Sequence, residues 1–292
     1  MLQPSFIKKW EEFPDESITD VPLPSATSKE TYFRRLDIFL NAIRAGEIKK
    51  AILSRVKITD RPENFNAIKT FQKLCNKHPQ TFAYLLLHPD AGMWMGATPE
   101  LLLSEINNCI HTMALAGTQS ARANHHYTWK EKECDEQNMV EQHVEAVFQK
   151  HGYGLTKKTG PKTVEAGKVA HLKTDYEFCK GVSDLDEVLK DLHPTPAVGG
   201  LPAAQAVDFI AKHEGYDRRY YCGFIGELND DHYVRLYINL RCMQIGATEI
   251  AIYCGGGITA DSVPEPEWQE TVEKSTTMFD LVKETEKHDI VR

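Results

Sequence analysis

Apolar and polar residues alternate along the chain with two periods, and each period predicts one type of element. Apolar side chains three or four positions apart, starting at Phe33 and Leu36, predict a helix that begins at the capping-box pair Thr27 and Glu30 and ends at Gly46. The same spacing predicts helices at 65–74, 128–150, 185–192, 202–212 and 266–287. Period two predicts strands at 49–59, 81–87, 93–97, 109–116, 164–174, 220–227, 233–245 and 249–253.

The order of these elements indicates the fold class. Strands follow one another through short turns, which favours antiparallel pairing, and helices separate the hairpins without strict β–α–β alternation. The segment 192–202, LHPTPAVGGLP, is rich in proline and glycine and is expected to have no regular structure. The sequence therefore predicts an α+β protein with a large content of antiparallel sheet.

The composition excludes several classes of function. With 41% apolar and 26% charged residues the chain is typical of a globular protein, and its net charge of −8 argues against a nucleic-acid partner. The chain has no run of about 18 apolar residues, so no membrane span is predicted. The N-terminus lacks the apolar region of a signal peptide. Seven scattered cysteines, never spaced Cys-x-x-Cys, predict reduced thiols in the cytoplasm and no zinc site.

The segment 254–274 is the strongest candidate for binding chemistry. Its three glycines, Gly255–Gly257, allow backbone N–H groups to approach an anion closely. The following helix presents Glu267, Glu270 and Lys274 on one face, because these positions lie three and seven residues apart. Glycines, two carboxylates and a lysine together indicate a site for a carboxylated substrate held through a metal ion.

A second Glu-x-x-Glu pair, Glu133 and Glu136, lies on the helix predicted at 128–150. Four carboxylates on two helices would suit Mg²⁺, which prefers oxygen ligands and retains several waters. The alternative is that each pair belongs to a solvated helix face, which is common in a chain with 42 acidic residues. The spacing alone leaves both interpretations open.

Two further side chains have surroundings that suit proton transfer. Lys50 shares a strand face with Ile52 and Val56, and burial there would lower its pKa towards that of a usable base. The alternative is a lysine at the end of a strand whose amine reaches solvent. Glu100 lies between Pro99 and three leucines, which should raise its pKa and suit it to donate a proton. Its alternative is an ordinary acid at the start of a strand or helix.

The remaining candidates are weaker. His171 interrupts a strand-like run and is by default a hydrogen-bonded core histidine. The chain lacks HExxH, GxSxG, P-loop and GxGxxG motifs. The residues alone therefore indicate a magnesium-dependent enzyme that acts on a carboxylate.

Ten short motifs, in the same order along the chain, resemble those of the chorismate-utilising enzymes, and in particular those of the isochorismate synthases. They are KAILSR (50–55), GATPELLL (96–103), LAGT (115–118), KECDEQ (132–137), HLKT (171–174), LHPTPAVGG (192–200), YYCGFIGEL (220–228), NLRC (239–242), GGGIT (255–259) and PEWQETVEK (266–274). The segment HPTPAVGG has the isochorismate-synthase form, since anthranilate synthases usually carry a GTVSGAPK-like string at this place.

This resemblance implies one catalytic domain over residues 1–292, with an N-terminal arm and helix at 1–46 and a family-like core at 47–287. It implies two large antiparallel sheets flanked by helices, with the active site between them. The implied activity is the Mg²⁺-dependent conversion of chorismate to isochorismate for menaquinone or siderophore biosynthesis. The enzyme is expected to be cytoplasmic and monomeric, with chorismate as its partner and no nucleic acid or membrane.

The motif positions also imply roles for single residues. Lys50 would activate water for attack at C2 of chorismate, and Glu100 would protonate the hydroxyl that leaves from C4. The metal site would consist of Glu136 and Glu270, with Glu133 and Glu267 acting through water. The substrate site would consist of Thr118, His171, Tyr221, Arg241, Gly255, Gly257 and Lys274.

Two features depart from the family pattern. Gln137 stands where relatives usually have histidine, and its amide is expected to hydrogen-bond a metal-binding glutamate. The chain before Lys50 is also short, which leaves the stability of the fold and the protection of a sheet edge open.

Two alternatives to the implied activity remain. A salicylate synthase would use the same site and add the elimination of pyruvate. A non-catalytic relative would retain the pocket without turnover, although the presence of Lys50, Glu100 and four glutamates argues against it.

Overall fold

Six helices and twelve strands make up the part of the chain that the computed structural model describes, residues 21–121, 126–179, 181, 184–228 and 233–287. The helices are α2 (Lys29–Arg44), α3 (Ala67–Lys77), α4 (Glu131–Lys150), α5 (Leu185–Leu192), α6 (Ala203–His213) and α7 (Pro264–Lys287). The strands are β1 (Lys50–Asp60), β2 (Phe82–His88), β3 (Gly92–Thr98), β4 (Leu101–Ile106), β5 (Cys109–Ser120), β6 (Gly154–Ala166), β7 (Val169–Cys179), β8 (Gly200–Leu201), β9 (Phe224–Leu228), β10 (Val234–Ile238), β11 (Cys242–Ile245) and β12 (Glu249–Ile258). Most of the predicted N-terminal arm, residues 1–20, lies outside the described residues.

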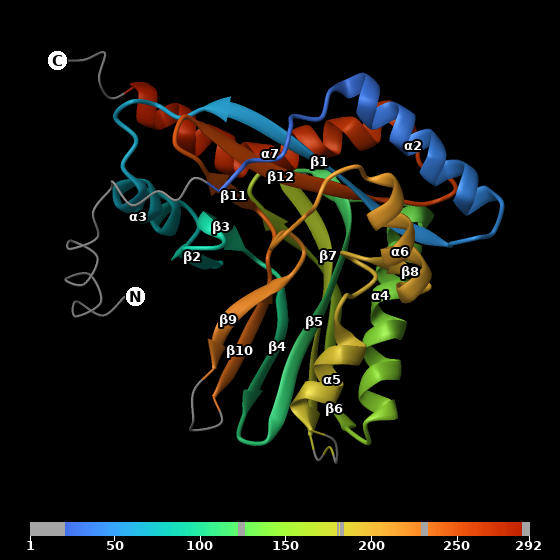
Figure 1. Cartoon of the computed structure of the whole chain (residues 1–292). Helices are drawn as coiled ribbons and strands as arrows, with labels where there is room; N and C mark the ends of the chain where they lie inside the picture. The colour runs from blue at the N-terminus through green and yellow to red at the C-terminus, as the bar shows by residue number, and fades with distance from the viewer. Residues whose placement is uncertain (1–20, 122–125, 180, 182–183, 229–232, 288–292) are drawn as a thin grey trace.

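The strands form two six-stranded sheets in which every neighbouring pair is antiparallel (Figure 1). The first sheet has the order β2-β3-β11-β12-β1-β8, and the second has the order β6-β7-β5-β4-β10-β9. The predicted α+β class, with two large antiparallel sheets flanked by helices, is confirmed.

The chain passes directly from one sheet to the other at two places. A dipeptide that ends with Glu100 joins β3 to β4, and residues 239–241 join β10 to β11. The two crossings are hydrogen-bonded: Ile238 N donates to Glu100 O at 2.9 Å, and Ala97 N donates to Arg241 O at 3.1 Å. Two candidate site residues far apart in the sequence, Glu100 and Arg241, therefore lie where the sheets join.

The helices cover the sheets with their apolar faces. In α2, Tyr32, Leu36 and Phe39 are fully buried and pack in one cluster with Leu53 of β1. The long helix α7 lies along β12 of the first sheet, whereas α4 packs against β5 and β7 of the second (Figure 1). The four candidate metal ligands thus belong to helices on different sheets. Across the described ranges, no helix combines the length and apolar character needed to cross a membrane.

Helix α2 begins one residue later than the capping-box pattern predicts. The side chain of Ser28, rather than that of Thr27, accepts a hydrogen bond from Thr31 N, at 3.2 Å. Thr27 is instead paired with β1, because its backbone N donates to Val56 O at 2.9 Å. Because Thr27 pairs with β1, it does not serve as the helix N-cap that the local pattern predicts.

The strand predicted at 164–174 is wrong in its boundaries, because it spans a hairpin turn. The structure has two strands, β6 and β7, joined by a turn in which Gly167 adopts φ +67°. Strand β6 is an exposed edge strand whose residues 154–163 are mostly polar, with Leu155 the one large apolar side chain, and show no alternation. Since an exposed edge needs no apolar face, the sequence carries no strand signal there.

The C-terminal meander is also divided differently from the prediction. Strands β9 and β10 belong to the second sheet and β11 and β12 to the first, so the predicted strand 233–245 is broken at its centre. The proline- and glycine-rich segment is not wholly irregular, because Gly200 and Leu201 form β8 and pair with β1. Neither outcome is visible locally, because strand partners are chosen by tertiary packing.

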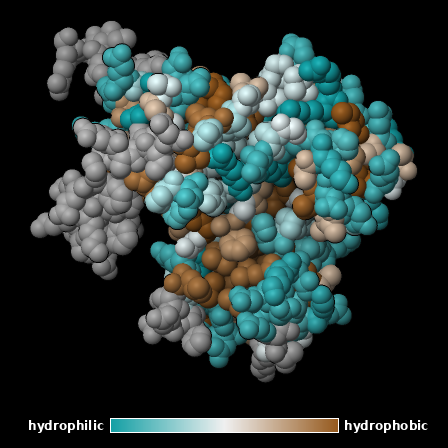
Figure 2. Space-filling view, in the orientation of Figure 1, coloured by the Kyte–Doolittle hydropathy of each residue, from teal (hydrophilic) through white to brown (hydrophobic). Residues whose placement is uncertain are grey.

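Apolar residues gather on one face of the second sheet. Figure 2 shows them in the lower part of the view, over β9, β10 and β4. The exposed large apolar side chains Phe224, Leu228 and Ile106 belong to β9 and β4. Because β9 is an edge strand, this edge presents exposed apolar side chains beside a single charged one, Glu227.

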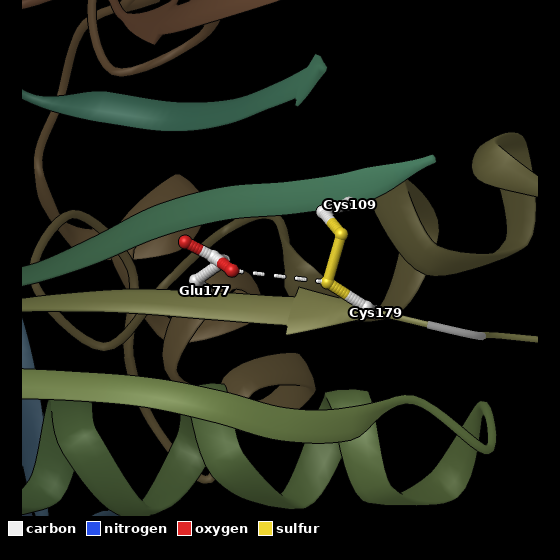
Figure 3. A group of neighbouring side chains, drawn as sticks. All are labelled: Cys109, Glu177 and Cys179. Atoms are coloured by element: carbon white, nitrogen blue, oxygen red, sulfur yellow. Dashed lines mark hydrogen bonds between the residues drawn. A yellow bond between two sulfur atoms is a disulfide. The ribbon is translucent and has the colours of Figure 1, made fainter. Parts of the chain in front are cut away.

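Cys109 of β5 and Cys179 of β7 form a disulfide (Figure 3). The two residues are direct partners across antiparallel strands, with Cα atoms 4.3 Å apart. The expectation of seven reduced thiols is therefore wrong for this pair, whose separation of 70 residues has no signal in the sequence. Figure 3 also shows Glu177 beside the bridge. Because the two sulfurs are bonded to each other, these three residues offer no metal site.

Replacing Cys109 with serine is expected to lower the free energy of unfolding by about 3 kcal/mol, because the bridge closes a long loop in the unfolded chain. Urea unfolding without reductant measures the effect, and Cys134→Ser, at an exposed free cysteine, is the control. Wild-type protein in reductant should unfold like the Cys109→Ser variant. Equal midpoints for wild type with and without reductant would contradict this prediction.

Candidate active site

A cavity lies where the two sheets join. Both sheets, helices α4 and α7, and the loops before β8 and β9 contribute to its wall. The lining residues are Ile52, Pro99, Glu100, Leu115, Ala116, Thr118, Glu136, His171, Ala197, Val198, Tyr221, Cys222, Leu240, Arg241, Tyr253, Cys254, Gly255, Gly256, Gly257 and Lys274. This wall includes all seven residues predicted to bind substrate, together with Glu100 and Glu136.

Lys50 does not itself line this cavity, but it is hydrogen-bonded to Glu136, which does. It is the first residue of β1 and is fully buried, and its Nζ donates a hydrogen bond to Glu136 Oε1 at 2.8 Å. A Cβ at Gly257 would lie 2.9 Å from Lys50 Cε, so glycine at this position gives the lysine side chain room. The structure therefore buries Lys50 and excludes the alternative of an amine that reaches solvent.

Glu100 is a buried acid, 4% exposed, at the first crossing between the sheets. Burial raises its pKa to about 7, although the positive charges of Lys274, Lys50 and Arg241 act in the opposite direction. This is the direction that its apolar neighbours predict. Near neutral pH the carboxyl is thus divided between a protonated form, which can donate a proton, and an ionised form.

His171 is neutral and orients an arginine. Burial, together with the charges of Arg241 and Lys274, lowers its pKa to about 3. Its Nδ1 lies 2.9 Å from Gly117 O and therefore carries the proton. Its Nε2 is left to accept a hydrogen bond from Arg241 Nη2 at 3.3 Å. His171 thus fixes the guanidinium without adding charge to the cavity.

Two non-glycine residues in the cavity wall have left-handed backbone conformations. Cys222 has φ 66° and Arg241 has φ 47°. Such residues are strained by about 1–3 kcal/mol and persist only where the surroundings hold them in place. Beside Cys222, the ring of Tyr221 stacks on Tyr253 with centroids 5.6 Å apart. This packing keeps the wall that carries Tyr221 in place.

Three of the four candidate metal ligands surround the backbone of Gly256 and Gly257. A Cβ at Gly257 would lie 2.6 Å from Glu136 Oε1, and a Cβ at Gly256 would lie 3.2 Å from Glu270 Oε1 and 3.5 Å from Glu267 Oε2. A side chain at Gly257 would therefore displace Glu136, whereas one at Gly256 would only crowd Glu270. The first two turns of α4 and α7 thus direct their acids at the same stretch of β12.

The fourth ligand, Glu133, lies further out. It lines a second, more polar cavity together with Glu267 and Glu270, and Thr118 borders both cavities. The Oε2 atom of Glu133 accepts a hydrogen bond from Lys130 N at 2.9 Å, so this side chain also caps its own helix.

The carboxylates suit a divalent cation, but lysines balance their charge in this structure. Glu136 is paired with Lys50, Glu270 with Lys274 at 2.6 Å, and Glu267 with Lys132 at 2.7 Å. Burial, followed by the charge of Glu270, raises the pKa of Glu267. Within the described residues, no three of the four carboxylates have oxygens that all lie within 4.8 Å of one another. The donor set fits Mg²⁺ in chemical type.

Contrary to the expectation, Gln137 does not hydrogen-bond any of the candidate metal ligands. Its Oε1 accepts from Ala116 N at 2.9 Å, and its Nε2 donates to Ala114 O, to Glu141 Oε1 and to Thr174 Oγ1. The side chain points to β5 and β7, because the residue that follows Glu136 lies on another face of the helix. Gln137 therefore anchors α4 to the second sheet.

The sequence did not reveal an ion pair that lies behind the cavity. Glu214, 1% exposed, accepts from Arg218 Nε at 2.6 Å, just beyond the end of α6. Their spacing of four residues was the available signal. Because it falls in a polar segment outside a predicted helix, it does not stand out from ordinary surface charge.

Known proteins resemble the chain over most of its length. The vibriobactin-specific isochorismate synthase of Vibrio cholerae is 29% identical over 272 residues, which cover 88% of this chain and 68% of that protein. The isochorismate synthase EntC of Escherichia coli is 25% identical over 266 residues, with the same two shares.

The fold is shared with solved structures. A putative 2,3-dihydroxybenzoate-specific isochorismate synthase, DhbC from Bacillus anthracis, superposes with a TM-score of 0.78 at 24% identity, over 90% of this chain and 76% of that one. The profile of the family described as chorismate binding enzyme matches residues 6–283. The resemblance that the ten motifs indicate is thus confirmed, and the chain belongs to the chorismate binding enzyme family.

Proposed function

We propose that this protein is an isochorismate synthase, which adds water at C2 of chorismate, releases the hydroxyl at C4 and so isomerises its substrate. The observation that carries the proposal is a single cavity that joins a buried acid, Glu100, to the cationic side chains of Arg241 and Lys274, with a buried lysine, Lys50, hydrogen-bonded to Glu136 in its wall. The relatives with this activity in their names support it. We place the product in siderophore or menaquinone biosynthesis.

Lys50 and Glu100 carry out the two proton transfers in this proposal. Lys50, in its neutral form, takes a proton from the water that attacks C2, and both ring double bonds shift by one position as the C4–O bond breaks. Glu100, in its protonated form, gives a proton to the C4 hydroxyl, which leaves as water. One water is added and one is released, so the composition of the substrate is unchanged. The raised pKa of Glu100 supports its role as the acid.

The substrate carboxylates need cationic and N–H partners. Arg241 offers a planar fork that suits a carboxylate, and His171 holds that fork in place. Lys274, whose Nζ also contacts Gly255 O at 3.1 Å, adds a second positive charge. The backbone of Gly255 and Gly257 and the side chains of Tyr221 and Thr118 complete the substrate-binding residues of the proposal.

Mg²⁺ is part of the proposal. Glu136 and Glu270 would hold the ion, with Glu133 and Glu267 contributing through water. When bound, it would neutralise the ring carboxylate and fix its orientation. The glycine backbone that leaves room for three of these acids supports the assignment.

A product assay tests the proposed function. Purified protein is incubated with chorismate and MgCl₂, and the products are separated by chromatography. Isochorismate as the main product is the expected result. Salicylate with an equal amount of pyruvate would replace the proposal with a salicylate synthase, and unchanged chorismate would indicate a non-catalytic relative.

Replacing Glu270 with glutamine is expected to raise the MgCl₂ concentration for half-maximal activity by about tenfold or more, because one anionic ligand is lost. The rate as a function of MgCl₂ concentration, and calorimetric titration with MgCl₂ in the absence of chorismate, both measure the effect. Glu265→Gln, which alters an exposed acid on the same helix, is the matched control. An unchanged MgCl₂ titration would remove Glu270 from the metal site.

A further inference from the structure

The ion pair of Glu214, which is buried, and Arg218, which is partly exposed, lies directly behind the wall of the active-site cavity. Neither side chain lines that cavity, but both line a third cavity, distinct from the polar one beside Glu133, that shares Val198, Tyr221 and Cys222 with it. The two cavities therefore have a common wall. The ion pair supports this wall from the side opposite to the active-site cavity.

The glutamate connects the pair to the strand of Lys50. Glu214 Oε1 accepts hydrogen bonds from Ser54 N at 2.6 Å and from Ser54 Oγ at 2.7 Å. Ser54 lies on β1, the strand that begins with Lys50, and its hydroxyl also contacts Tyr216 OH. The carboxylate thereby fixes the position of β1 relative to the loop after α6.

The arginine connects three segments of the cavity wall. Arg218 Nη2 donates to Ile52 O at 2.7 Å, and its Nη1 donates to Val198 O at 3.1 Å. Its own backbone O accepts from Tyr221 N at 2.9 Å. Ile52, Val198 and Tyr221 come from β1 and from the loops before β8 and β9, and all three line the cavity.

A buried ion pair is a weak device for stability alone. Apolar residues of similar volume often stabilise a fold as well as such a pair, whereas removal of one partner leaves an unpaired buried charge. A planar guanidinium held at two points by a carboxylate is a good device for fixing geometry. Reacting groups need such fixed geometry, because a displacement of about 1 Å can lower a rate by about a hundredfold.

We propose that Glu214 and Arg218 form a positioning unit that holds the strand of Lys50, the Val198 loop and the Tyr221 loop in the arrangement required for the reaction, without touching substrate. This inference rests on the proposed function and adds positioning residues to it. The side chains that touch substrate remain those of the cavity.

The test separates catalysis from stability. In Glu214→Leu/Arg218→Met, both charges are replaced by apolar side chains. This double variant is expected to keep a Tm close to that of wild type, while kcat for isochorismate formation falls about a hundredfold. The single variant Arg218→Lys keeps the charge but loses the fork, and it should lose both kcat and Tm. Lys190→Ala, in an exposed ion pair on α5, is the control and should change neither.

Two outcomes would overturn the inference. One is a double variant that recovers both Tm and kcat, which would make the pair purely structural. The other is an Arg218→Lys variant with wild-type kcat. If the double variant does not fold, the inference is tested by the kcat of Arg218→Lys alone. Circular dichroism must first show that this variant is folded.

If the protein is not an isochorismate synthase, the experiment gives a result that differs from failure of the positioning unit. Wild-type protein would then form no isochorismate, and amide hydrogen exchange of residues 195–200 and 218–223 would replace kcat as the measurement. Faster exchange in the folded double variant than in Lys190→Ala would still support the positioning unit. Equal exchange would overturn it.

Discussion

Replacing Lys50 with alanine is expected to lower kcat for isochorismate formation by about a thousandfold, because the variant lacks the group that takes the proton from water. The side chain is fully buried, so no bulk solvent base replaces it at the same position. The variant also leaves Glu136 without its partner at 2.8 Å. Circular dichroism and Tm must therefore show that the variant is folded.

The neighbouring lysine is the matched control for this experiment. Lys49 precedes β1 and has an exposed side chain, so Lys49→Ala should retain wild-type kcat and KM. Steady-state kinetics on the three proteins measure the effect. A Lys50→Ala variant that converts chorismate as fast as wild type would exclude Lys50 as the base.

Replacing Glu100 with glutamine is expected to have two opposite effects, a loss of activity and a gain of stability. Glutamine cannot donate the proton to the leaving hydroxyl, so kcat should fall by about a thousandfold. In wild type, the acid must be protonated, so kcat should decrease as pH rises through about 7, the pKa of Glu100. This descending limb should be absent from the residual activity of Glu100→Gln.

The stability effect follows from the same raised pKa. In the unfolded chain Glu100 titrates near 4.5, and in the folded protein near 7. The folded state therefore binds the proton more tightly, and the free energy of unfolding falls as pH rises from 4.5 to about 7. Since one pKa unit corresponds to about 1.4 kcal/mol, the ionised carboxylate costs about 3 kcal/mol above pH 7. Glu100→Gln should remove this cost.

Urea unfolding at pH 5 and pH 8 measures this difference. The stability gained by Glu100→Gln over wild type should be larger at pH 8 than at pH 5. Glu105→Gln, on the same strand β4 and partly exposed, is the matched control. An equal gain at pH 5 and pH 8 for Glu100→Gln would show that Glu100 has an ordinary pKa.

Periodicity predicted elements with one apolar face well and elements without one poorly. Helix α2 and strand β1 lie close to their predicted ranges, because Leu36 and Val56 belong to strong local patterns. Strand β6 was missed because its exposed residues carry no such pattern. The bridge of Cys109 and Cys179 was missed for a related reason, since strand pairing alone brings them together.

The candidate site was predictable as a set of residues but not as an arrangement. Motif resemblance identified Lys50, Glu100 and Arg241, and it supplied the family. The pairing of Lys50 with Glu136 depends on the distance between β1 and α4, which no local pattern contains. The role of Gln137 was mispredicted because its direction depends on how α4 packs against β5 and β7.

By itself, the sequence determined the fold class, the family and the residue types at the site, because these depend on local periodicity and on motifs. The tertiary structure alone decided where the chain crosses from one sheet to the other. Those crossings place Glu100 and Arg241 in one cavity and bury the acid enough to raise its pKa to about 7. Burial and charge at this site are sums over residues from distant segments. Only packing of the two sheets brings those segments together.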